Sequence, residues 1–164
     1  MMDVLWHEVW RGIRTDFADL PGTAEVTQIV VRLLLAALLG GLVGFQRERS
    51  GKAAGFRTHI LVALGAAFFV LIPSQAGMPL ADLSRVLQGI ITGVGFLCAG
   101  TILKRHEPEE IEGLTTAAGL WLTAAVGSAA GMGREASAVL GTVLAFIVLS
   151  LLPRIRLHAK PEEE

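Results

Sequence analysis

Five long runs of apolar residues dominate this sequence and restrict how the chain can fold. A helix needs about 20 mostly apolar residues to cross the hydrocarbon core of a bilayer. The runs are Val26–Phe45, Phe56–Ile72, Val86–Leu103, Leu114–Met132 and Ala136–Leu152. A soluble domain of 164 residues has too little polar sequence to cover five such helices. The pattern therefore predicts an all-α membrane protein, a bundle of about five transmembrane helices.

The chain is expected to have three parts: an amphipathic segment at 1–25, the bundle at 26–153 and a cytoplasmic tail at 154–164. In the first part, apolar residues recur at helical spacing and charged residues occupy the other face. The apolar positions are Val4, Leu5, Val9, Ile13 and Phe17, flanked by Trp6 and Trp10. This pattern is typical of a helix that lies on the membrane surface. A frayed terminus is the alternative, and the charges interrupt any signal-peptide core.

The distribution of Lys and Arg predicts the orientation, because these residues favour cytoplasmic loops. One side of the predicted bundle carries Arg47, Arg49, Lys52, Arg57, Lys104, Arg105, Arg154, Arg156 and Lys160. The other side carries Arg11, Arg14, Arg32, Arg85 and Arg134. With an odd number of spans, the N-terminus is expected outside and the C-terminus in the cytoplasm.

Composition excludes several classes of function. Hydrophobic residues make up 52% of the chain and charged residues 18%, and the net charge is −1. No basic, aromatic-rich segment is present, so we expect no nucleic-acid partner. A single cysteine, Cys98, rules out an intramolecular disulfide and reads either as a small buried side chain or as a chemical group.

Glycines at four-residue spacing indicate close helix packing, since helices in lipid associate through small residues. Gly40 with Gly44, Gly89 with Gly93, and Gly127 with Gly131 form three such pairs. The first two follow Arg32 and Arg85, and their helices lead to the similar starts Gly55–Thr58 and Gly113–Thr116. A duplicated helical hairpin and a chance similarity both explain this repeat.

Polar residues inside the runs are few, and no Asp or Glu lies near the middle of any run. The intramembrane polar and packing positions singled out here are Gln88, Thr92, Cys98, Thr101 and Trp121. Bound Mg²⁺ and Ca²⁺ use carboxylate ligands, and proton-coupled carriers place acids in the membrane. We therefore expect no cofactor and no metal site within one copy.

Polar residues at the predicted cytoplasmic face form a candidate site. They are Arg47, Glu48, Arg57, Thr58, His59, Thr115 and Thr116. Glu48 is expected to pair with Arg47 or Arg57, and the two helix starts offer N–H groups to an anion. The alternative is a belt of cations that extend to the interface and serve only topology. His59 has no second histidine at ligand spacing and is expected to be a hydrogen-bonded helix-start residue.

Four segments of this sequence resemble the MgtC/SapB family of bacterial inner-membrane proteins. They are Arg32–Glu48, Gly51–Gly65, Ile91–Leu103 and Gly113–Gly127. The resemblance implies a small polytopic protein linked to growth in low magnesium, with members connected to restraint of F-type ATP synthase and to small membrane peptides. The resemblance covers the bundle domain only, and the soluble C-terminal domain that many members add is not expected here.

The favoured interpretation is a non-enzymatic regulator that contacts another integral membrane protein or a small membrane peptide. Besides membrane lipids, the expected partners include a second copy of the chain, with a dimer favoured. The alternative is a small oligomeric transporter or channel, magnesium-related, with its path between protomers or along Gln88 and Thr92. No nucleophile–base pair, metal cluster or phosphate loop is visible, which disfavours an enzyme.

Overall fold

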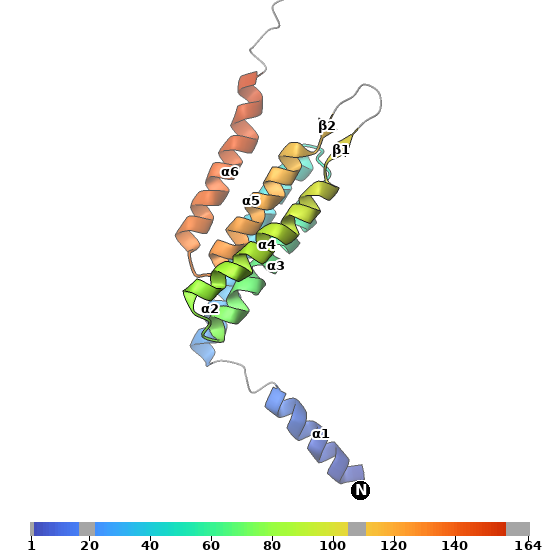
Figure 1. Cartoon of the computed structure of the whole chain (residues 1–164), viewed down its shortest axis with the longest axis vertical. Coiled ribbons are helices and arrows are strands. Elements are labelled where there is room, and N and C mark those ends of the chain that lie inside the picture. Colours follow the sequence, from blue (N-terminus) through green and yellow to red (C-terminus); the bar gives the residue numbers. More distant parts are fainter. Residues whose placement is uncertain (1, 17–21, 105–110, 157–164) are drawn as a thin grey trace, which may run out of the picture. The chain divides into compact units, whose positions relative to one another are not determined.

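The computed structural model of this chain describes residues 2–16, 22–104 and 111–156, which are almost entirely helical (Figure 1). Within these residues there are six helices and one pair of two-residue strands. They are α1 (Met2–Asp16), α2 (Thr23–Arg49), α3 (Phe56–Gln75), α4 (Leu80–Gly100), β1 (Leu103–Lys104), β2 (Ile111–Glu112), α5 (Leu114–Gly131) and α6 (Glu135–Arg156). The predicted all-α helical class is confirmed.

Three of the described helices, α2, α3 and α4, are long and apolar enough to cross a membrane by length and composition. Between 17% and 33% of the most apolar part of each is buried within the protein, so most of this apolar surface faces outward and needs lipid. Within α6, the stretch Glu135–Leu151 is apolar but shorter than these three helices. Crossing of the bilayer by α5 and α6, and the orientation of the bundle, stay predictions.

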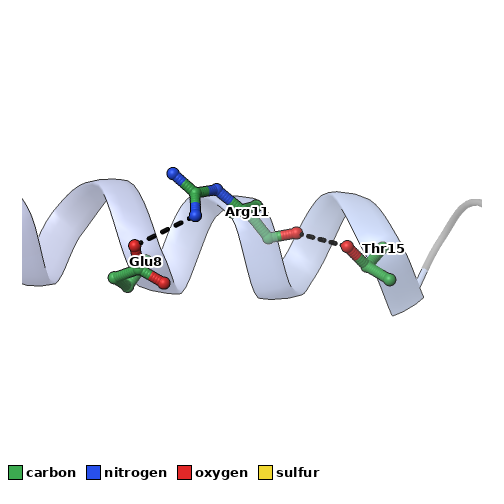
Figure 2. A network of polar contacts seen from close by, with 3 residues as sticks. All are labelled: Glu8, Arg11 and Thr15. Atoms are coloured by element: carbon green, nitrogen blue, oxygen red, sulfur yellow. Dashed lines mark hydrogen bonds and ion pairs between the residues drawn. The ribbon is translucent and has the colours of Figure 1, made fainter.

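The chain divides into two compact units, residues 1–31 and 32–164. In the first unit, α1 confirms the predicted N-terminal helix. Arg11 pairs with Glu8 at 3.1 Å, and the Thr15 hydroxyl donates to the Arg11 carbonyl at 2.9 Å (Figure 2). Its exposed apolar residues include Leu5, Trp6, Val9, Trp10 and Ile13. Contact of α1 with a membrane surface stays a prediction, and Phe17 lies outside the described residues.

The second unit is built around α3 and α5, which lie side by side (Figure 1). One core cluster joins α2, α3, α5 and α6, and a smaller one joins α3, α4 and α5. The buried members of the first are Ala36, Leu39, Ala63, Ala67, Val126, Ala130 and Ala138. Alanine dominates because small side chains let helix backbones approach closely. Eleven of the 18 residues of α5 are buried, so this helix offers little surface to lipid.

Two of the three glycine pairs provide the closest helix contacts. A Cβ atom on Gly40 would lie 2.7 Å from Ala63 Cβ, and one on Gly127 would overlap the Ala63 carbonyl oxygen. Helix α3 is therefore held from two sides, by α2 and by α5. Gly89 and Gly93 of α4, in contrast, have no neighbouring heavy atom within 4 Å of the Cβ position. The two halves of the apparent repeat use their glycines differently, and duplication itself stays a prediction.

Arg32 of α2 holds the end of the second unit at which α5 turns into α6. Its Nε lies 3.8 Å from Glu135 Oε1 and its Nη1 donates to the Gly131 carbonyl at 3.5 Å. Gly133, at φ +70°, makes the sharp turn between α5 and α6 and lies against the Arg32 guanidinium. The first predicted arginine of the repeat thus joins α2 to the α5–α6 turn.

Several helix ends differ from the expected runs. The runs expected to end at Ile72 and Leu152 continue as helix through a proline, to Gln75 in α3 and to Arg156 in α6. The third run was expected to begin at Val86, but α4 begins at Leu80. The fixed φ of proline is compatible with a helix, and its cost is one missing N–H donor. The third expected run extended to Leu103, but α4 ends at Gly100 and Leu103 pairs with Glu112 in the short strand pair.

The two glycine environments predict opposite effects for the same substitution. Gly127→Ala should lower the free energy of unfolding by about 1–3 kcal/mol, because its Cβ has no room against Ala63. Gly89→Ala should leave stability unchanged or raise it by up to about 1 kcal/mol, because alanine has the higher helix propensity. Unfolding of the purified variants in detergent measures both. Equal stability of the two variants would contradict the packing described.

Candidate functional site

The predicted cytoplasmic cluster begins where α2 crosses α3. A Cβ atom on Gly44 would lie 2.8 Å from His59 Cβ, so the two helices touch at this point. This contact leaves the side chain of His59 fully buried. His59 is therefore an interior residue of the bundle.

Arg47 lies one turn beyond Gly44 on α2 and is also buried, with 4% of its surface exposed. Its Nη2 donates a hydrogen bond of 3.1 Å to the Thr116 hydroxyl, which joins the end of α2 to the first turn of α5. Its Nε is buried and has no hydrogen-bond partner. A guanidinium stays charged in proteins, so this side chain carries a buried, incompletely satisfied positive charge.

His59 is incompletely satisfied as well. Its Nδ1 lies 2.9 Å from the Gly55 carbonyl oxygen, which can only accept, so Nδ1 carries the proton. Its Nε2 is buried and has no partner. Nε2 lies against Gly119 of α5, where a Cβ atom would be 3.7 Å away, an ordinary van der Waals contact. Arg47 and His59 are both buried where α2 crosses α3, and Arg47 bonds Thr116 of α5, so the three helices meet at one buried polar centre formed by Arg47, His59 and Thr116.

Glu48 has a role that differs from the expected ion pair. Its Oε2 accepts a hydrogen bond of 2.7 Å from the Phe56 N–H, the first residue of α3. Within the described residues, neither Arg47 nor Arg57 forms a salt bridge with it, so the expected pair is wrong. Gly55 makes room for this cap, since a Cβ there would lie 2.6 Å from Glu48 Oε2. The carboxylate complements the helix N-terminus, so the start of α3 offers a weaker site for an external anion than expected.

The remaining predicted residues of the cluster lie apart from the buried polar centre. Arg57 and Thr58 are exposed on α3 and line a groove between α3 and α4. Thr115 is exposed on α5. The structure therefore brings together three of the seven predicted residues, assigns one to a helix cap and leaves three on the surface.

The predicted intramembrane polar residues do not form one site. Gln88 and Thr92 are exposed on α4, and the Thr92 hydroxyl donates to the Gln88 carbonyl at 2.9 Å. The Cys98 thiol lies 3.1 Å from the Ala117 carbonyl and links α4 to α5, while the Thr101 hydroxyl donates to the Cys98 carbonyl. Trp121 is half exposed beside a cavity of about 240 Å³ between α4 and α5. In the parts of the chain that are described, no three His, Cys, Asp or Glu residues group as metal ligands.

A groove between α3 and α4 has a volume of about 710 Å³. Arg57 and Thr58 lie at one end of it, and the rest of its lining is apolar or glycine. The other lining residues are Leu61, Val62, Gly65, Ala66, Phe69, Val86, Gly89, Ile90, Gly93, Val94 and Leu97. Gly65, Gly89 and Gly93 have open space where a Cβ atom would be. The glycine pair of α4 has no packing partner among the described residues and thus opens onto this groove.

Sequence reasoning missed Gln46 and Gly65. Gln46 Nε2 donates to the Leu149 carbonyl of α6 at 3.2 Å, and its Oε1 is buried without a partner. A glutamine next to Arg47 at the end of an apolar run was the available signal for Gln46. The sequence could not predict that Gly65 lines the groove, because this depends on the distance between α3 and α4.

These features define a small helical membrane protein with a buried polar centre at one end and an open, glycine-lined groove on one side. The MgtC family model matches residues 33–157, and the chain belongs to this family. The predicted resemblance is confirmed. No solved structure matches the chain.

Curated relatives have similar sequences over most of this chain. It is 43% identical to protein SrpB of Synechococcus elongatus, over an alignment that covers 76% of this chain and 75% of SrpB. It is 37% identical to the putative magnesium transporter YhiD of Escherichia coli K12, over 78% of this chain and 62% of YhiD. It is 45% identical to protein MgtC of Brucella abortus, over 71% of this chain and 48% of MgtC. The chain thus spans less than two thirds of YhiD and about half of MgtC.

The hydrogen bond between Arg47 and Thr116 predicts a contrast between adjacent threonines. Thr116→Val keeps the side-chain shape and removes the acceptor, so a charged donor is left unpaired and the free energy of unfolding should fall by about 2 kcal/mol. Thr115→Val, at an exposed position, should change it by less than about 0.5 kcal/mol. Unfolding in detergent compares the two. If both variants match the parent protein, Arg47 does not depend on Thr116.

Proposed function

We propose that this chain is a non-enzymatic membrane protein of magnesium homeostasis that acts by contacting another integral membrane protein. The α3–α4 groove is the observation that carries the proposal. It is apolar, about 710 Å³ in volume and floored by glycines that no helix of the described chain covers. A transmembrane helix of a partner fits such a surface, because glycine lets two helix backbones approach closely in lipid.

The link to magnesium comes from the family and its named members. YhiD is called a putative magnesium transporter, and the chain shares the MgtC family with protein MgtC. We extend the magnesium connection to this chain as adaptation to low magnesium in the bacterial inner membrane, with the C-terminus cytoplasmic. F-type ATP synthase and small membrane peptides are the partners suggested by the family resemblance.

Contact fits the described residues better than transport through one copy. Two polar contacts inside the bundle join neighbouring helices, Arg47 with Thr116 and Cys98 with Ala117, so these groups support packing and do not line a path. The alternative, an oligomeric magnesium transporter, is favoured by one observation: Gln88 and Thr92 are exposed and lie along the same face of α4. Only an assembly of copies would enclose a path along these two residues.

Filling the groove tests the proposal. In a bacterial strain lacking its MgtC-family gene, Gly93→Leu should abolish rescue of growth in magnesium-poor medium, because the new side chain occupies the groove. Gly95→Leu is the matched control: it adds the same side chain on the same helix, in open space outside the groove lining. It should retain rescue, and both variants should unfold in detergent like the parent protein.

Flux measurements separate the two candidate functions. The purified protein in liposomes should move no magnesium, whereas a dye-reported flux that Thr92→Val abolishes would support the transporter instead. Loss of rescue in both glycine variants, with normal folding, would also contradict the proposal that the groove binds a partner helix. Cross-linking from groove positions distinguishes a different partner protein from a second copy of this chain.

A further inference from the structure

A second hollow, at the end of the bundle where α2 finishes, has a different character from the α3–α4 groove. It lies between α2 and α6 and has a volume of about 460 Å³. Three of its lining residues are cations, Arg47, Arg49 and Lys52, and no described residue of the lining is a carboxylate. Phe45, Phe146 and Leu149 make its apolar side. A hollow with a cationic part and an apolar part fits an amphiphile with a negative head.

Arg47 is an incompletely bonded residue in the lining of this hollow. The side chain is 4% exposed, one of its N–H groups is bonded to Thr116, and Nε has no partner. The nearest carboxylate in sequence, Glu48, is engaged with the Phe56 N–H. A buried guanidinium with a free donor lacks an anionic acceptor, which a ligand in the hollow would supply.

The end of α2 places the other two cations beside Arg47. Gly51, at φ +66°, adopts the left-handed conformation that folds the chain back, and the Lys52 N–H then bonds the Arg47 carbonyl at 3.1 Å. The Arg49 guanidinium lies over the Phe45 ring, 5.4 Å from its centre. The turn also covers the helix end, because the N–H groups of Ser50, Gly51 and Lys52 occupy carbonyls that would otherwise repel an anion.

Pro153 leaves a backbone carbonyl of α6 free to bond α2 beside the hollow. Proline has no N–H, so the carbonyl of Leu149, four residues earlier, receives no bond from it within the helix. Gln46 Nε2 donates to that carbonyl at 3.2 Å and ties α2 to α6 beside Arg47. The proline that continues α6 thus frees the acceptor that shapes this site.

We propose that the hollow binds an anionic phospholipid, with the lipid phosphate against Arg47, Arg49 and Lys52. Phosphate oxygens would accept the free Arg47 donor, and an acyl chain would run along Phe45 and Phe146. The site lies at the end of the membrane-spanning part of α2, where lipid headgroups are found, and basic pockets between helices at this depth suit anionic headgroups. This inference is independent of the α3–α4 groove and of the proposed function.

Lipid binding to the purified full-length protein tests the site. In neutral detergent, phosphatidylglycerol should bind and raise the unfolding temperature, whereas phosphatidylcholine with the same acyl chains should do neither. Native mass spectrometry counts the bound lipids, and the unfolding temperature reports the effect. Inorganic phosphate alone should bind at least tenfold more weakly than phosphatidylglycerol, because it lacks the acyl chains.

Charge substitutions locate the binding. Arg49→Gln and Lys52→Gln are at exposed positions and should each weaken phosphatidylglycerol binding about fivefold, with the double variant weakened more. Arg57→Gln is the matched control: it removes one charge at the same end of the bundle, outside the hollow, and should bind like the parent. Equal weakening by Arg57→Gln would show diffuse attraction and overturn the site. Equal affinity for inorganic phosphate would overturn the assignment to a lipid.

Discussion

The close contact of α3 with two glycine-bearing helices is the constraint on which the rest of this structure depends. Ala63 lies at its centre, fully buried, with Gly40 of α2 on one side and Gly127 of α5 on the other. In a bilayer, apolar side chains gain little free energy by leaving lipid to contact one another, so dispersion and close backbone approach must hold the helices together. A methyl group at either glycine would separate the helices and open the core.

The same contact determines where the polar groups lie. Because α2 crosses α3 at Gly44, His59 is buried and Arg47, one turn later, reaches Thr116 on α5. These groups connect three helices near one end of the bundle. Helix α4 contributes no residue to this buried polar centre. Its glycine pair has open space at the Cβ position and lines the groove for which we propose a partner helix.

The sequence predicted the helical class and the N-terminal helix well, because the length and spacing of apolar residues report directly on helices. The family was predicted from the resemblance of four sequence segments. Side-chain partners were harder to predict. Glu48 stands between two arginines in sequence, yet its carboxylate caps α3, since Gly55 has no Cβ and lets it approach the Phe56 N–H to 2.7 Å. Likewise, Gly89 and Gly127 look alike in sequence, and only the placement of α4 relative to α3 distinguishes an open surface from a packed one.

Nuclear Overhauser contacts at Ala63 test the central claim most directly. In the full-length protein in nanodiscs, the Ala63 methyl group should show a cross-peak to the Hα protons of Gly40, and the Ala63 Hα should show one to Gly127. Both contacts are expected because the Cβ positions of these glycines lie within 3 Å of Ala63 atoms. An Ala63 methyl group that shows cross-peaks to lipid and to neither glycine would contradict the account.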